Sequence, residues 1–246
     1  MKHVTTFLAI SLLISTNVFA YSSSSRVCKN DRVVFDHNFS GTVVEVFNNG
    51  TVKINSDSHN SYQIRNIRDI GVARRCVEHL CANSRANFDN SFSGLITEVY
   101  DNGIVKINSD SHSSYQYRRI QDIGAENRCL ANVCKNDRVN FDYNFSGKVE
   151  EVYDNGMVKI NSDSHSSYQY RQIQDVGVAR RCISQLCVHD GVSFDYSFSG
   201  RVVEIYDNGM VKINSDSHNS YQYRRIQDLG AEVRCSTSKG PRKICY

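Results

Sequence analysis

The sequence has no tryptophan, only one proline and little net charge. Without tryptophan it lacks the usual aromatic platform of sugar-binding proteins, and a single proline argues against a proline-rich linker protein. After residue 20 no stretch is apolar enough to cross a membrane. The formal net charge is +3, and the basic residues are not gathered in one run except in a short C-terminal tail. Binding to a phosphate backbone requires clustered positive charge, so nucleic acid is not an expected partner.

Catalytic and zinc-binding motifs are also missing. No Gly-x-Ser-x-Gly and no Cys-x-x-Cys occurs, which argues against a serine hydrolase elbow and against a close pair of zinc ligands. Glu45 and Asp57 could be read as an acid–base pair. The simpler interpretation of Glu45 is a strand residue that pairs across a hairpin with Lys53. We therefore expect neither enzyme activity nor a cofactor.

The first twenty residues have the layout of a secretory signal peptide. Lys2 and His3 precede an apolar run at 7–14, and Val18 and Ala20 occupy the −3 and −1 positions of a cleavage site. The alternative is a buried N-terminal helix. We expect a signal peptide at 1–20, a serine-rich lead at 21–27, and export to a periplasm or to the outside of the cell. Nine cysteines agree with an oxidising compartment.

The rest of the chain repeats one unit four times. Cys28, Cys81, Cys134 and Cys187 lie 53 residues apart, and Cys76, Cys129, Cys182 and Cys235 follow with the same period. A fixed period of this length indicates a tandem array. The predicted boundaries are 28–80, 81–133, 134–186 and 187–235, followed by a basic tail at 236–246.

The local pattern within each unit is β rather than α. Short runs rich in β-branched residues alternate with polar loops, and Asn49-Gly50 supplies the positive φ of a tight hairpin. In the first unit the pattern predicts strands at 32–36, 42–47, 52–55 and 62–65, a helical turn at 66–68 and a closing strand at 69–76. We expect an all-β fold of four tandem five-stranded units of about 50 residues each.

The order of these signals resembles the SH3-like small β-barrels, including the Tudor, KOW and bacterial SH3 groups. The resemblance is carried by 31–33, 41–46, Asn49-Gly50, 52–54 and the segment from Tyr62 to Ile67. It covers most of the chain after the lead, and its motifs are loose. It implies closed or nearly closed barrels, and bacterial SH3 kinship implies cell-wall peptide as a ligand. Fold similarity by itself does not fix function.

Two disulfide schemes fit the cysteine spacing. A unit of about 50 residues buries little apolar surface, so a staple is expected. In an SH3-like barrel the first and last strands are adjacent. Cys28 could therefore meet Cys76 in the first unit, and the equivalent cysteines could meet in the other units. That scheme is favoured here, because closing so long a loop contributes roughly 4 kcal/mol. The second scheme joins Cys76 to Cys81, Cys129 to Cys134 and Cys182 to Cys187 across the linkers for about 2 kcal/mol each. It pairs Cys235 with Cys245 and leaves Cys28 over. The favoured scheme leaves Cys245 over, for an intermolecular disulfide that would link a dimer.

A polar tract varies least among the four units, although the linkers and unit starts have drifted. It runs from Asn55 to Arg65 in the first unit and offers carboxylate, imidazole, phenol, amide and guanidinium groups. We interpret it as a candidate ligand surface. Its members are Asn55, Asp57, His59, Tyr62, Gln63 and Arg65, then Asp110, His112, Tyr115 and Arg118, then Asp163, His165, Tyr168 and Arg171, and finally Asp216, His218, Tyr221 and Arg224.

Three other interpretations of this tract remain open. Asp and Ser side chains can simply cap their own loop, with Tyr and Arg packed on the wall of the sheet. Asp57 and His59 could bind a metal together with Asp36, although only one histidine recurs. The Tudor resemblance implies an aromatic cage of Phe39, Phe47 and Tyr62, rings that could equally fill the core.

Taken together, the sequence predicts an exported, multivalent binding or scaffold protein. Four weak sites in fixed order would gain strength through effective concentration. The expected partner is a cell-wall peptide or glycan, or another envelope protein. The alternative is a structural spacer or surface-coat protein without a ligand.

Overall fold

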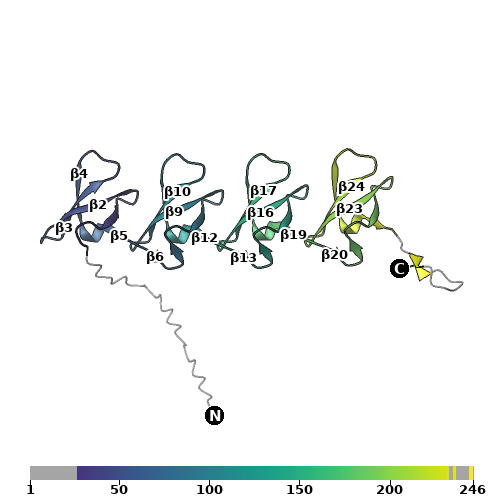
Figure 1. Cartoon of the computed structure of the whole chain (residues 1–246), viewed down its shortest axis with the longest axis horizontal. Helices are drawn as coiled ribbons and strands as arrows, with labels where there is room; N and C mark the ends of the chain where they lie inside the picture. The colour runs from purple at the N-terminus through teal and green to yellow at the C-terminus, as the bar shows by residue number, and fades with distance from the viewer. Residues whose placement is uncertain (1–26, 233–234, 237–243, 246) are drawn as a thin grey trace, which may run out of the picture.

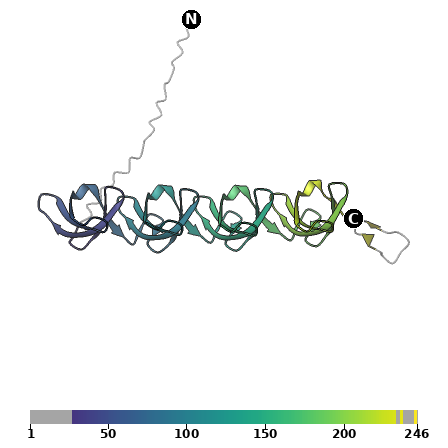
Figure 2. The same cartoon turned by 90° about the horizontal axis from the view of Figure 1, so that it is seen from above.

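The structure of the chain is a computed structural model, which describes residues 27–232, 235–236 and 244–245. The predicted signal peptide lies outside these residues, as do most of the serine-rich lead and most of the basic tail. Four similar units follow one another in a straight row, all in the same orientation (Figures 1 and 2). No helix among the described residues is long and apolar enough to span a membrane.

Each unit contains five antiparallel strands and one short 3-10 helix, as the sequence predicts. The first unit comprises β1 (Arg32–Phe35), β2 (Phe39–Val46), β3 (Thr51–Ser56), β4 (Tyr62–Asn66), η1 (Ile67–Asp69) and β5 (Ile70–Arg74). The second comprises β8 (Arg85–Phe88), β9 (Phe92–Tyr100), β10 (Ile104–Ser109), β11 (Gln116–Arg119), η2 (Ile120–Asp122) and β12 (Ile123–Asn127).

The third and fourth units repeat this order. They comprise β15 (Arg138–Phe141), β16 (Phe145–Tyr153), β17 (Met157–Ser162), β18 (Gln169–Gln172), η3 (Ile173–Asp175) and β19 (Val176–Arg180), then β22 (Gly191–Phe194), β23 (Phe198–Tyr206), β24 (Met210–Ser215), β25 (Tyr221–Arg225), η4 (Ile226–Asp228) and β26 (Gly230–Ala231).

Within the first unit the strand order is β5–β1–β2–β3–β4. Gly50, at φ 82°, makes the Asn-Gly hairpin between β2 and β3, and a bulge between Val43 and Glu45 bends β2. The sheet is open, and no pairing between β4 and β5 is found among the described residues. All-β architecture is thus confirmed, whereas a closed barrel is not found.

One hydrophobic core lies inside each unit. In the first it consists of Val33, Phe35, Val43, Val52, Ile54, Ile70 and Val72, all buried, with Phe39 and Ile67 packed against them. Alternation along β1 and β3 sends these side chains to one face. Val46, which the strand pattern would also place inside, is 42% exposed.

The units are joined by strand pairing rather than by simple linkers. After Val72, strand β5 leaves β1, and Ala73 and Arg74 pair with Tyr100 and Val99 of β9. Antiparallel pairing of the same kind joins β12 to β16 and β19 to β23, so the four units form one 20-stranded sheet. A small shared cluster of Val34, Tyr100 and Ile104 packs at the first junction.

Short disulfide-closed hairpins follow each of the first three units. They are β6 (Cys76–Val77) with β7 (Leu80–Cys81), β13 (Cys129–Leu130) with β14 (Val133–Cys134), and β20 (Cys182–Ile183) with β21 (Leu186–Cys187). Leu80, fully buried, belongs to the core of the following unit. A fourth strand pair, β27 (Cys235–Ser236) with β28 (Ile244–Cys245), lies near the C-terminus.

The favoured disulfide scheme is therefore wrong. The bonds are Cys76–Cys81, Cys129–Cys134 and Cys182–Cys187, each across five residues of sequence. The last strand runs beside the first for only three residue pairs before it crosses to the next unit. Cys76 is thereby carried away from Cys28. No finding supports a dimer through Cys245, whose side chain lies outside the described part of the chain.

Candidate functional site

The loop between β3 and β4 carries the polar tract, and its histidine is held by the unit itself. The His59 ring lies 4.6 Å from the Phe39 ring in an edge-on arrangement, and its Nδ1 is 2.9 Å from Ser56 Oγ. His112, His165 and His218 repeat the Ser contact. This imidazole closes the loop over the aromatic edge of the core, which is the turn interpretation of the tract.

The arginine of the tract is also engaged within its own unit. Arg65 Nη2 donates to Asp36 Oδ2 at 2.6 Å, and its guanidinium lies over the Phe35 ring at 5.3 Å. The Arg65 hydrogen bond lowers the pKa of the Asp36 carboxyl below its ordinary value. Arg118, Arg171 and Arg224 pair with the equivalent aspartates. A ligand would have to displace this pairing to reach the guanidinium.

Asp57 pairs with a residue that the sequence analysis did not single out. Arg32, at the start of β1, donates to both carboxylate oxygens at 2.9 and 2.6 Å, and Ser40 Oγ donates at 2.6 Å. The Arg32 hydrogen bond holds the pKa of Asp57 well below its usual range. Asp110 and Asp163 have the same partners, Arg85 with Ser93 and Arg138 with Ser146.

This ion pair extends across the junction into the next unit. Arg32 Nη2 lies 2.9 Å from Glu98 Oε1, and Ser40 Oγ accepts from Lys106 Nζ and from the Tyr117 hydroxyl, both at 2.9 Å. The Tyr100 hydroxyl donates to Glu98, and burial raises the pKa of Tyr100. We call this set of seven side chains the junction network: Arg32, Ser40, Asp57, Glu98, Tyr100, Lys106 and Tyr117.

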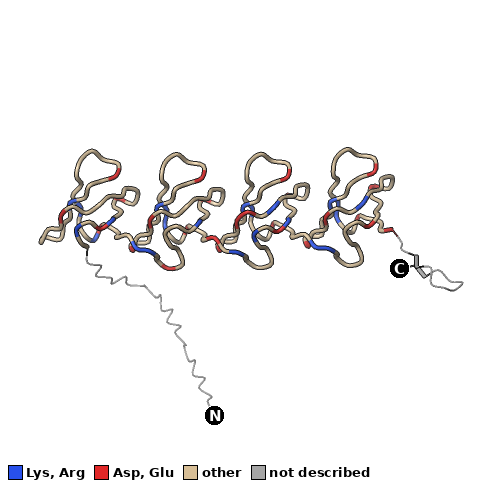
Figure 3. Tube along the Cα trace, viewed as in Figure 1, with Lys and Arg blue, Asp and Glu red and all other residues tan. Residues whose placement is uncertain are grey.

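The junction network recurs at the other two junctions. In the second it is formed by Arg85, Ser93, Asp110, Glu151, Tyr153, Lys159 and Tyr170, and in the third by Arg138, Ser146, Asp163, Glu204, Tyr206, Lys212 and Tyr223. Many charged residues of both signs accordingly recur at similar places from unit to unit (Figure 3). Asp57, Asp110 and Asp163, predicted as ligand residues, therefore hold neighbouring units together.

The tyrosines of the tract stay exposed. Tyr62, Tyr115, Tyr168 and Tyr221 are 52 to 57% exposed. A lysine ammonium lies over each ring, 4.5 Å from the ring centre in the case of Lys53 and Tyr62. The four units have the same orientation in the row (Figure 1). Residues at the same phase, that is at equivalent positions of the 53-residue repeat, therefore face the same side. Gln63, beside Tyr62, donates to Ser61 and to no distant group that is described.

The geometry gives little support to an aromatic cage or a metal site in the tract. Asn55 pairs with Tyr62 in the β3–β4 ladder, and Lys53 lies 3.4 Å from Glu45, as expected for a cross-strand pair. Phe39 is committed to Phe35 at 5.9 Å rather than to a cage. Within the described ranges, no group of three His, Cys, Asp or Glu side chains is arranged to hold a metal ion.

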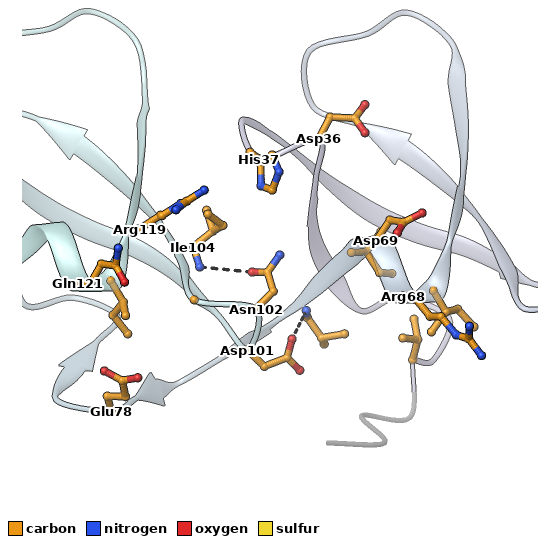
Figure 4. Close-up of a pocket in the computed structure, with 16 residues that line it drawn as sticks. Asp36, His37, Arg68, Asp69, Glu78, Asp101, Asn102, Ile104, Arg119 and Gln121 are labelled. Carbon is orange, nitrogen blue, oxygen red and sulfur yellow. Dashed lines mark hydrogen bonds between the residues drawn. The ribbon is translucent and has the colours of Figure 1, made fainter. Parts of the chain in front are cut away.

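A cleft of about 1150 Å³ lies between the first two units (Figure 4). Asp101 and Asn102 at its centre accept backbone hydrogen bonds from Val72 and Ile104. Charged groups of both signs line its edges, including Arg68 and Glu78. The second unit has Gln121 at the phase of Arg68, so this lining is not repeated along the array.

A comparison of the chain with models of known protein families and with curated proteins finds no match. The functional argument therefore depends on the geometry of the chain itself.

Proposed function

We propose that this protein is an exported scaffold of SH3-like modules that binds a repeating envelope polymer through its row of exposed tyrosines. The observation that carries the proposal is the recurrence of one exposed tyrosine, with a lysine ammonium over its ring, in each of four units that lie in a single row. Pairing of β1 with β5, together with the order of the other strands, supports the SH3-like kinship. The three disulfides among the described residues are typical of an oxidising compartment and support export.

A repeating polymer suits this arrangement better than a single small ligand. Each tyrosine offers one flat face and one hydroxyl, which is enough for a weak stacking contact with a sugar ring or a peptide side chain. Four such contacts in fixed register add through effective concentration. Cell-wall glycan and its peptide have the required repeat, and another envelope protein is the alternative partner.

The decisive experiment is a pull-down on purified cell wall. A variant with Tyr62, Tyr115, Tyr168 and Tyr221 replaced by Ser should lose most of the wild-type binding. Tyr196→Ser is the matched control, because Tyr196 is fully exposed and outside the row; it should bind like wild type. Equal binding of the fourfold variant and wild type would reject the tyrosine row as the binding surface.

A structural spacer is the second candidate. It is favoured by the fact that Asp57, His59 and Arg65 and their equivalents are all engaged in contacts of the protein with itself. Absence of any binding by the wild-type protein to cell-wall glycan, wall peptide and envelope proteins would favour the spacer over the scaffold.

A further inference from the structure

The two ends of the row present the two halves of a junction. The first unit exposes the β2–β3 side, which in later units packs on the preceding unit. The fourth unit exposes the β22–β26 side, which in earlier units receives the following one. We propose that these ends bind each other, so that the protein associates head to tail through a fourth copy of the junction.

The exposed side of the fourth unit, which we call the tail face, is an open socket. A cleft of about 360 Å³ is lined there by Gly191, Ser193, Ser199, Asp216, Gly230 and Glu232. Ser199 Oγ donates to Asp216 at 2.7 Å, as Ser146 does to Asp163 at the third junction. There the same serine also accepts from Lys212 at 3.0 Å and from Tyr223 at 2.9 Å. The open socket thus retains Ser199 and Asp216, the equivalents of the serine and aspartate that contact a lysine of the following unit at the third junction.

Gly230 leaves space on the tail face for a side chain of an incoming unit. At the equivalent position of the first unit, a Cβ on Gly71 would lie 2.2 Å from the side chain of Asn102 in the next unit. The glycine leaves room there for that incoming asparagine. The fourth unit keeps a glycine at this position, Gly230, where no incoming asparagine is present among the described residues.

The exposed side of the first unit, which we call the head face, carries the complementary groups. Lys53, Glu45 and Asn49 stand at the phases of Lys106, Glu98 and Asn102. Val46 and Phe47 are 42% and 37% exposed. At the equivalent positions of the second unit, Val99 is buried in the core of its own unit and Tyr100 is buried with Val34 of the preceding unit. Ile64, at the phase of Tyr117, is 51% exposed. Head-to-tail contact would cover this apolar patch.

The end contact lacks some groups of the internal junctions. Gly191 stands where the other units have Arg32, Arg85 or Arg138, and Phe47 and Ile64 lack the hydroxyls of Tyr100 and Tyr117. The fourth contact is therefore weaker than the internal ones and is not helped by a covalent link. Reversible, concentration-dependent association follows. A head-to-tail contact between copies does not close on itself, so it generates linear chains.

Sedimentation velocity over a concentration series tests this proposal on the chain without residues 1–20. The mean sedimentation coefficient of the wild type should rise with concentration. Lys53→Glu and Asp216→Lys should each weaken association about tenfold or more, because each places like charges together at the contact. Lys148→Glu makes the same charge change at an exposed site in the third unit and should leave association unchanged.

A mixture of the two charge-reversed variants makes the test specific. The intact head of Asp216→Lys fits the intact tail of Lys53→Glu, so an equimolar mixture should recover complexes that neither variant forms alone. Unchanged circular dichroism and melting temperature would show that both variants are folded. Wild type that sediments as a monomer at every concentration, or Lys53→Glu that associates like wild type, would overturn the proposal.

Discussion

At the residue scale, the same amino acid makes different contacts in different units. Lys106 is buried in a junction and reaches Ser40 and Asp57 of the preceding unit, whereas Lys53 lies on the free head face beside Glu45. Position within the array, rather than residue type, thus decides what each lysine contributes. This difference cannot be read from one unit alone.

Lys106→Met should lower the free energy of unfolding by about 1–3 kcal/mol, because it removes a buried charged donor to Ser40 and Asp57. Lys53→Met changes the same residue type with the same tyrosine contact and should cost little, as expected for an exposed pair. Urea denaturation of both variants measures the difference. Equal destabilisation by the two substitutions would mean that the junction network does not stabilise the array.

The junction aspartates predict a loss of stability in acid. Hydrogen bonds from arginine hold the pKa of Asp57, Asp110 and Asp163 far below the value of about 3.9 in an unfolded chain. The folded state therefore binds fewer protons than the unfolded state as the pH falls. Their contribution is complete above about pH 5 and is lost progressively below it.

Urea midpoints measured from pH 7 down to pH 3 test this dependence. The wild-type midpoint should stay nearly constant to about pH 5 and then fall. A variant with Asp57, Asp110 and Asp163 replaced by Asn should be less stable at pH 7 and should show a shallower acid slope. Asp36 and its equivalents, also paired with arginine, maintain the rest of the slope. An unchanged slope in the triple variant would contradict the assignment.

At the scale of elements, the linker hairpins combine a disulfide with a core anchor. Cys76 and Cys81 are directly paired in the hairpin, and Leu80 between them enters the core of the second unit. The hairpin thus ties the end of one unit to the interior of the next. The disulfide closes only a short loop, so its contribution is limited.

Replacement of Cys76 and Cys81 by Ser should cost about 2 kcal/mol, which is the loop-entropy value for so short a loop. Leu80→Ala should cost about 2–5 kcal/mol, because it creates a cavity in a buried core. Chemical denaturation compares the two variants under oxidising conditions. A larger loss from the cysteine pair than from Leu80→Ala would show that the sulfur bond, rather than the apolar anchor, holds the hairpin.

Local sequence signals predicted the strands well but not how the units meet. Alternation and the Asn49-Gly50 turn act over a few residues, so the strands, the hairpin and the turn at Ile67 were all expected. The departure of Ala73 and Arg74 from β1 depends on a neighbouring unit. The disulfide prediction failed for this reason, since it assumed that each sheet ends within its own unit.

The sequence predicts the residues of the polar tract but not their partners, because many of those partners lie in other parts of the unit or in the next unit. Constancy of Asp57 and Arg65 among units predicts a ligand surface, and the structure shows these side chains paired with Arg32 and Asp36 of the protein itself. One signal for the junction network was available. The phase of Arg32 holds arginine in three units and Gly191 in the last, and the phase of Tyr100 holds Phe47 in the first. Substitutions confined to terminal units mark the surfaces between units.

At the scale of the whole molecule, three equivalent junctions join the units into a straight row (Figure 2), and we expect this row to be stiff. Each junction contributes strand pairing, a disulfide-closed hairpin and the junction network. Such a row keeps the four exposed tyrosines in fixed register, which is the condition for multivalent binding. Both the proposed polymer binding and the proposed end-to-end association depend on this stiffness.

Small-angle X-ray scattering of the chain without residues 1–20 tests the stiffness most directly. At concentrations where the chain is monomeric, the rod predicts scattering with a clear cross-sectional region, and a distance distribution with one short peak and a long linear tail that matches the four-unit row. A distribution with the smooth, rounded fall of beads on flexible linkers would contradict a fixed array, and with it the common basis of both proposals.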